Sequence, residues 1–209
     1  MPHTAPHLLP ENQIIATVSH QEFKAFAKEQ MAKEGGYKKF FTIALLLTAF
    51  GFSASAGYAT VLFFVEDVWF YLLQIGLGFL FSLSLLLIIH ELLHGIAYKI
   101  AGAKKVYFGA VLSQFVFYAG SDQEEFNGRQ FRLIAIFPFA VITGLGLLSL
   151  LLFPQYFFFT LTALFFHTLF CSGDFAILNF MQQYDLDQIH TSDSKSKEET
   201  YYYLKPSQG

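Results

Sequence analysis

The chain has 209 residues, of which 54% are hydrophobic, 19% are aromatic and only 14% are charged, and its formal net charge is −3. Soluble domains carry about 25% charged residues, so this composition indicates an integral membrane protein and excludes an ordinary soluble domain. The single cysteine, Cys171, excludes a disulfide within the chain.

The first segment, residues 1–39, is mostly polar. Its first 17 residues contain three prolines and no clear period, which predicts a loose tail. Ser19 and Glu22 have the spacing of a capping box, and the residues after them predict an amphipathic helix that ends at Gly35-Gly36. This helix could lie along the membrane surface or pack as a solvated helix on the rest of the protein. Because the first apolar run begins only after about forty residues, we expect an uncleaved anchor rather than a removed signal.

Four apolar runs follow, and each is long enough to cross a bilayer, which takes about 20 residues. They cover residues 40–65, 69–101, 133–153 and 156–182. Residues 40–183 are therefore predicted to form one membrane domain with about four transmembrane helices. The remaining residues, 184–209, are polar and charged, and they are expected to form a flexible tail.

The segment between the second and third runs differs in kind. Residues 104–118 are rich in β-branched and aromatic side chains, which predicts two short strands around Leu112-Ser113. Ser121-Asp122 is predicted to cap a polar helical stretch from Gln123 to Arg132. The predicted fold is thus an all-α integral membrane protein with a short β-hairpin and an N-terminal amphipathic helix.

The thirteen basic residues indicate how the chain crosses the membrane. All of them fall in the N-terminal segment, in or next to the 102–132 loop, or in the C-terminal tail. None falls in the turns at 66–68 and 154–155. Four spans place the three basic regions on one side, so the positive-inside rule predicts a multi-pass protein with both termini in the cytoplasm.

The second apolar run contains the sequence His90-Glu91-Leu92-Leu93-His94, which has the pattern HExxH. On a helix, residues i and i+4 differ by about 40° in azimuth, so His90 and His94 point the same way. Two neutral imidazoles can then bind one Zn2+ ion, with Glu91 beside them as a general base. The simpler interpretation is a polar patch that packs against other helices or lies at the headgroups. Ionisable residues inside a span are costly and usually functional, which favours the metal site.

A catalytic zinc ion usually has three protein ligands and one open position, so a third ligand is expected. Glu91 lies eight residues before Lys99, at the cytoplasmic end of its span, which is about 12 Å deep at 1.5 Å per residue. Asp174 lies eight residues before Gln182, the corresponding end of the fourth run, and so has the same depth of about 12 Å. A bare carboxylate at that depth needs a partner, so we expect Asp174 to be the third ligand.

His167 is the competing candidate for the metal site. It precedes Asp174 by seven residues, which puts the two about 20° apart on one helix face. His167 could instead be a hydrogen-bonded residue of helix packing. Cys171, which lies between them, is more often a small buried apolar residue than a ligand.

Three segments of the chain carry a resemblance to a known family: HELLHGIAYKIAGAKKVYFGA, QFRLIAIFPF and CSGDFAILN. They resemble a family of bacterial membrane proteins described as "putative zincin peptidase", which looks like a compact relative of the site-2 protease clan. The resemblance covers about residues 69–182 and implies a location in the bacterial cytoplasmic membrane. In site-2 proteases a transmembrane aspartate completes the zinc site, and that role falls on Asp174. Those enzymes commonly have glycine after this aspartate, where this chain has Phe175.

Motif, topology and resemblance together predict a zinc-dependent intramembrane endopeptidase that acts near the cytoplasmic side. Zinc would lower the pKa of its bound water, and Glu91 would take a proton from that water. We expect the lipid bilayer and a membrane-protein or peptide substrate as partners, and no nucleic acid. The alternative is a non-proteolytic membrane protein with a structural or vestigial metal site, in an accessory or immunity-like role. A transporter is a third possibility, but four short spans without a paired repeat disfavour it.

The predicted strands also suggest how an extended substrate could bind. Val106, Tyr107, Phe108 and Gly109 could offer a free strand edge to which a substrate pairs main chain to main chain. The hairpin could equally serve only to cover the cytoplasmic face.

Overall fold

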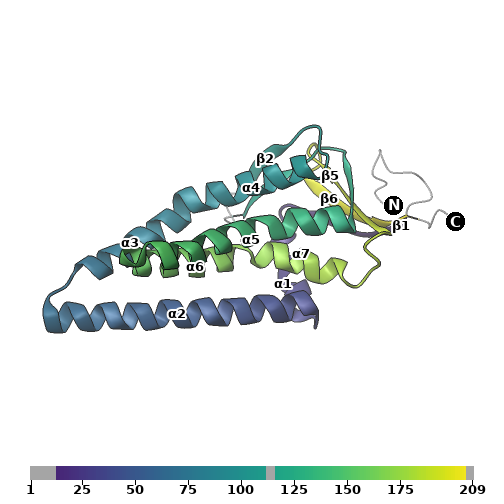
Figure 1. The fold of residues 1–209 in the computed structure, drawn as a ribbon. Helices are drawn as coiled ribbons and strands as arrows, with labels where there is room; N and C mark the ends of the chain where they lie inside the picture. The colour runs from purple at the N-terminus through teal and green to yellow at the C-terminus, as the bar shows by residue number, and fades with distance from the viewer. Residues whose placement is uncertain (1–12, 112–115, 206–209) are drawn as a thin grey trace.

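The computed structural model describes residues 13–111 and 116–205 (Figure 1). The predicted turn at Leu112-Ser113 lies outside the described residues, as do residues 1–12 and 206–209. The chain is mainly helical, as the sequence predicts, but it also carries two small β-sheets. The seven α-helices of the described residues are α1 (Phe23–Ala32), α2 (Gly36–Glu66), α3 (Phe70–Phe81), α4 (Leu87–Ile100), α5 (Gly128–Leu152), α6 (Phe157–Phe170) and α7 (Ser172–Met181).

Three helical segments are long and apolar enough to cross a membrane: Gly36–Glu66, Phe70–Ile100 and Gly128–Leu152. The second contains α3 and α4, joined without a break by the π-helical turn η1 (Ser82–Leu86). The fourth predicted run is bent. After the 3₁₀ turn η3 (Pro154–Tyr156), α6 and α7 meet at an angle of 42° and count as a span only if they are taken together.

The outer surface of the long helices supports a membrane location. Phe50, Phe64 and Leu151 are 75%, 78% and 79% exposed, and they belong to a wide belt of exposed large apolar side chains on α2 to α5. Soluble monomers rarely expose apolar patches of this extent, because water does not solvate them well. A surrounding lipid phase removes that cost.

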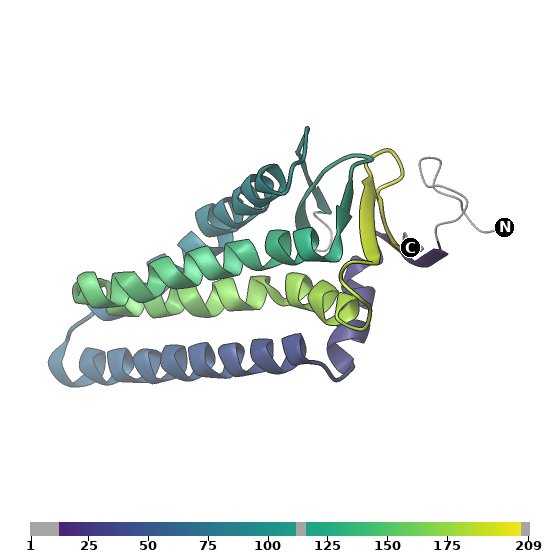
Figure 2. The ribbon, with the colours of Figure 1, turned by 45° about the vertical axis from the view of Figure 1, so that its right-hand side comes forward.

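The helices run lengthwise past one another, and both sheets lie at the same end of the bundle (Figures 1 and 2). α2 packs against α6 and α7, α3 packs against α6, and α4 packs against α5. β1 and β6, which hold the first and last described residues of regular structure, share that end. The bundle thus has three candidate membrane spans, or four if α6 and α7 are taken as one bent span.

The larger sheet corrects the expectations of a loose N-terminal tail, a flexible C-terminal tail and an all-α fold. Its strands are β1 (Gln13–Ser19), β4 (Glu125–Asn127), β5 (Ile189–Ser194) and β6 (Glu199–Leu204), in the antiparallel order β1-β6-β5-β4. Part of the expected loose N-terminal tail and much of the expected flexible C-terminal tail therefore pair with each other. The prediction of an all-α fold with only a hairpin was wrong in this respect, because strand pairing between distant segments leaves little trace in local sequence. The three consecutive tyrosines of β6 are buried: Tyr201, Tyr202 and Tyr203.

The predicted polar helix from Gln123 to Arg132 is also corrected. Its first part forms β4, and α5 begins only at Gly128. The cap is Asn127, whose side chain accepts from the Gln130 N–H at 2.9 Å, while the Gln130 side chain accepts from the Asn127 N–H at 3.0 Å. This reciprocal capping box satisfies two backbone donors, which fixes the start of α5.

The smaller sheet pairs β2 (Tyr107–Val111) with β3 (Val116–Gly120), so that Phe108 lies opposite Ala119. β3 packs on α4. The hairpin can approach this helix because Gly95 has no side chain: a Cβ there would lie 2.8 Å from the Phe108 ring.

Helix α1 is held against α7. The rings of Phe26 and Phe180 are 5.4 Å apart, and the Asn179 side chain donates to the Gln30 carbonyl at 2.9 Å. α1 therefore covers the end of the bundle at which the sheets lie.

Candidate metal centre

The HExxH segment lies on α4, directly after the π-helical turn. π turns insert an extra residue into a helix and occur often at functional sites. Before the turn, α3 packs on α6; after it, α4 packs on α5 and carries His90 and His94. Both histidines are buried, with exposed fractions of 3% and 7%.

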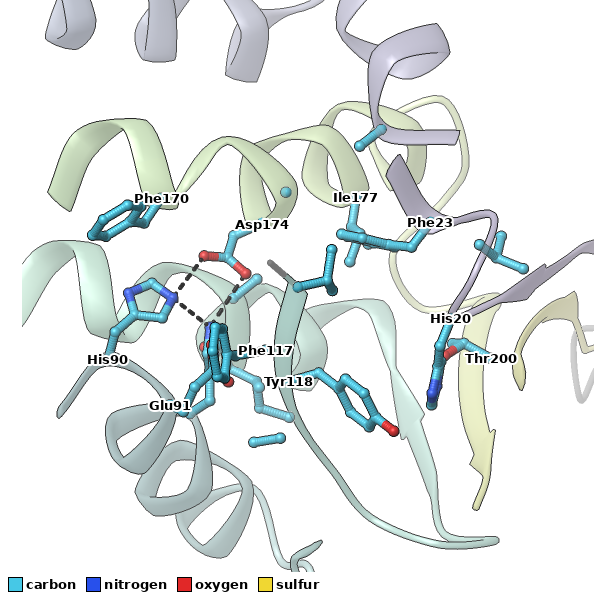
Figure 3. Close-up of a pocket in the computed structure, with 18 of the residues that line it drawn as sticks. His20, Phe23, His90, Glu91, Phe117, Tyr118, Phe170, Asp174, Ile177 and Thr200 are labelled. Atoms are coloured by element: carbon cyan, nitrogen blue, oxygen red, sulfur yellow. Dashed lines mark hydrogen bonds and ion pairs between the residues drawn. The ribbon is translucent and has the colours of Figure 1, made fainter. Parts of the chain in front are cut away.

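Three side chains converge beside α4 (Figure 3). The Nε2 atoms of His90 and His94 are 3.1 Å apart. Asp174, from the first turn of α7, places Oδ2 3.3 Å from His90 Nε2 and Oδ1 3.2 Å from His94 Nε2. A tetrahedral zinc ion with metal–ligand distances of about 2.0–2.2 Å separates its ligand atoms by roughly 3.3–3.6 Å. The observed spacings of 3.1–3.3 Å lie at or just below the lower end of that range, so the two imidazole nitrogens and the Asp174 carboxylate can occupy three corners of such a site.

A backbone carbonyl fixes the orientation of His94. Its Nδ1 lies 3.0 Å from the carbonyl oxygen of Ile134 on α5, so Nδ1–H donates and the lone pair remains on Nε2. Pro138 lies four residues after Ile134 inside α5 and has no N–H to donate to that carbonyl. The proline thus leaves a free acceptor within an apolar helix, where backbone groups must find partners. His94 supplies that partner.

His90 is held from its other side by α6. Its Nδ1 lies 3.2 Å from His167 Nε2, and the Cys171 sulfur lies 3.5 Å from the same His167 atom. His90, His167 and Cys171 are close enough to form a second possible metal group. His167 is therefore behind His90 rather than at the point between His90 and His94. The structure brings Asp174, and not His167, to that point.

Glu91 lies next to this group and lines the same cavity. Its Oε2 atom is buried and has no hydrogen-bond partner within the described residues. The backbone of Ala119 in β3 bonds to the carboxylate. Glu91 therefore places a buried carboxylate oxygen, unpaired within the described residues, beside the three converging side chains.

The cavity has a volume of about 430 Å³ and is lined by residues of α1, α4, α5, α6, α7 and both sheets. This volume is in the range of ligand sites of proteins, about 300–1,000 Å³. Of the four residues of the predicted substrate edge, only Tyr107 lines the cavity, whereas Val106, Phe108 and Gly109 do not. β3 lines it instead, through Val116, Phe117, Tyr118 and Ala119. The residues of this strand pair that line the cavity thus belong mainly to β3, whereas the predicted substrate edge lies in and next to β2.

Two lining residues lie in the predicted flexible C-terminal tail, and a third lies within the predicted capping box near the N-terminus. His20 follows β1, Asp193 lies in β5 and Thr200 lies in β6. No motif marks them, because they reach the cavity only through pairing of the chain's two ends. A sequence signal did exist for one missed feature: the isolated Pro138 predicts a free carbonyl at Ile134.

Comparison with known proteins is informative at the level of the family. No curated protein and no solved structure matches the chain. The model of the family DUF3267, described as "Putative zincin peptidase", matches residues 83–188, which is 106 of the 209 residues. The matched region contains all three converging side chains and Glu91. The chain belongs to this family of putative zincin peptidases, as its resemblance in sequence suggested.

Proposed function

We propose that this protein is a zinc-dependent intramembrane endopeptidase of the site-2 protease type, which cleaves a membrane protein near the cytoplasmic side. The observation that carries the proposal is the convergence of His90, His94 and Asp174 beside Glu91. A purely structural metal site has no use for a buried, unpaired carboxylate oxygen at its edge. The family membership supports the peptidase class.

In this proposal His90, His94 and Asp174 would hold Zn2+, which would supply a bound water to the reaction. When bound there, zinc would lower the pKa of that water and polarise the scissile carbonyl. Glu91 accepts the proton released from the water and passes it to the leaving amine. The Ile134 carbonyl and His167 keep the two imidazoles oriented throughout.

The location follows from charge and exposure. The positive-inside rule favours both chain ends in the cytoplasm, and the sheets with them. The family resemblance favours the bacterial cytoplasmic membrane. The apolar belt on α2 to α5 supplies the surface for the bilayer.

A transmembrane substrate must expose its carbonyls before hydrolysis, because a helix hides them in hydrogen bonds. We propose that the outer edge of β3, rather than β2, holds the unwound segment by main-chain pairing. The Ala119 backbone bonds to Glu91 at this edge of β3. Because strand geometry repeats every two residues, the N–H of Phe117 points to the same edge. A segment paired there would pass over the candidate metal centre.

The proposal is tested with the full chain purified in mild detergent, as wild type and as Glu91→Gln. We expect about one zinc per chain in both by elemental analysis. Cleavage of a membrane-protein substrate panel, measured on gels and by mass spectrometry, should occur only with the wild type. Absence of zinc from the wild type, or cleavage that persists in Glu91→Gln, would overturn the proposal.

The β3 edge is tested by Phe117→Pro, which removes an outward N–H but leaves the bonds between β2 and β3 in place. We expect turnover to fall by about tenfold or more with zinc content unchanged. Phe117→Leu is the matched control, since it alters the side chain and keeps the N–H. Equal losses in the two variants would show that the side chain matters and the edge does not.

A further inference from the structure

The cavity continues beyond the candidate metal centre to a second polar cluster. In Figure 3, His90 and Asp174 lie on one side, and Tyr118, His20 and Thr200 lie on the other. Tyr98 connects the two ends: it is one helical turn after His94, about 6 Å along α4, and its hydroxyl faces Asp193. One cavity therefore has a metal end and an Asp193 end.

Asp193 is buried, with 9% of its surface exposed, and its two oxygens differ in how well they are paired. Oδ1 accepts a hydrogen bond of 2.8 Å from the Thr200 hydroxyl. Among the described residues, Oδ2 has only two long hydrogen-bond contacts, 3.5 Å from the Tyr98 hydroxyl and 3.4 Å from the Ser121 N–H. Contacts of this length are at the limit of hydrogen bonding, so Oδ2 retains acceptor capacity.

The charge on Asp193 is also incompletely compensated. Burial raises its pKa to about 6, which still leaves the carboxylate mostly ionised at neutral pH. Within residues 13–111 and 116–205, no basic side chain forms an ion pair with it, although Lys24 lines the cavity from α1. A buried carboxylate without a cation is costly to the folded state, and removal of that cost favours binding of a cation.

The neighbours of Asp193 extend this environment. His20 Nδ1 and the Tyr107 hydroxyl are buried and have no hydrogen-bond partner within the described residues, and both residues line the cavity. Glu198 adds negative charge near His20 and Tyr118. The Tyr107 ring already attracts a cation, because Lys195 Nζ lies 5.4 Å from its centroid. The Tyr118 ring packs against His20, with the ring centroids 4.2 Å apart.

We propose that the Asp193 end of the cavity binds a basic side chain of the substrate, lysine or arginine, about two to four residues from the scissile bond. The estimate of two to four residues comes from the roughly 6 Å between His94 and Tyr98 along α4, an extended rise of about 3.3 Å per residue, and the reach of a long basic side chain. This inference rests on the proposed function. It assigns a substrate class, because the cytoplasmic ends of membrane spans are rich in lysine and arginine.

A binding experiment tests the inference without requiring cleavage. The full chain in detergent, carrying Glu91→Gln, is titrated against three fluorescein-labelled Leu/Ala peptides that differ in a single lysine, glutamine or glutamate. We expect fluorescence polarisation to show that the lysine peptide binds at least about tenfold more tightly than the glutamine peptide, and that the glutamate peptide binds most weakly.

The variant Asp193→Asn separates recognition from structure. Asparagine keeps the shape and can still accept from Thr200, so we expect the lysine-to-glutamine affinity ratio to fall to about one. A purely structural role would weaken all three peptides alike and preserve the ratio. Asp122→Asn is the control, because this nearby carboxylate does not line the cavity. The lysine-to-glutamine affinity ratio of this variant should equal that of the parent protein.

Two results would overturn the inference: equal affinities for the three peptides in the parent protein, or an unchanged ratio in Asp193→Asn. Failure of the proposed function can be told apart from failure of this inference. In that case the wild type would cleave no substrate, whether or not the binding assay shows a preference for lysine. Cleavage that depends on Glu91 but shows no lysine preference would reject the inference alone.

Discussion

The two ring nitrogens of His90 face two different side-chain clusters. Nε2 faces His94 and Asp174, whereas Nδ1 faces His167 and Cys171. Both clusters are compact enough to hold a metal ion. Only the first contains a carboxylate and lines the cavity, while His167 and Cys171 are fully buried.

The difference shows what a catalytic metal site needs besides suitable residue types. A dication in an apolar surrounding is stabilised by a negative ligand, and a reaction requires access for water and substrate. Asp174 and the cavity provide both on the Nε2 side. The Nδ1 side provides an acceptor that orients the ring, which is the usual task of a partner behind a metal-binding histidine.

The largest loss of zinc affinity is expected when the carboxylate on the Nε2 side of His90 is removed. Asp174→Asn should weaken zinc binding by more than about 100-fold, beyond the roughly 10–100-fold typical of outer-shell partners. Cys171→Ala is the control on the other side and should change zinc affinity by less than about threefold. Chelator competition measures both affinities. The reverse order of effects would place the metal on the Nδ1 side of His90.

An intermediate effect is expected when the partner behind His90 is removed. His167→Phe takes away the acceptor for His90 Nδ1–H and should weaken zinc binding by about 10–100-fold. His167→Gln offers a carbonyl acceptor and should recover most of that loss. If glutamine is no better than phenylalanine in the same competition assay, His167 acts through packing alone.

The smallest effect concerns the carbonyl that orients His94. Pro138→Ala restores an N–H that competes with His94 for the Ile134 carbonyl, and zinc affinity should fall by roughly two- to tenfold. The melting temperature without zinc should not fall, because alanine suits a helix interior better than proline. Ala140→Leu is a control for altered packing elsewhere on α5 and should not weaken zinc binding. A zinc affinity in Pro138→Ala equal to wild type would show that His94 does not depend on the freed carbonyl.

The sequence predicted more of the helices than of the strands. The apolar runs and the shared face of the two HExxH histidines depend on local composition and helix geometry, which a single sequence carries. The bend at Cys171 was not predicted, nor was the strand β4 in place of a polar helix. These features depend on neighbours that are distant in sequence.

The sequence alone thus determined the membrane class, the HExxH pair and a short choice of third ligands, because 3.6-residue periodicity and hydropathy are local properties. Tertiary structure alone decided which side of His90 faces the cavity, and which strand edge borders it. It also brought Asp193 and Thr200 to the far end of the same cavity. Those outcomes depend on pairing between the two ends of the chain and on packing between α4, α5 and α7, and no local pattern encodes such contacts.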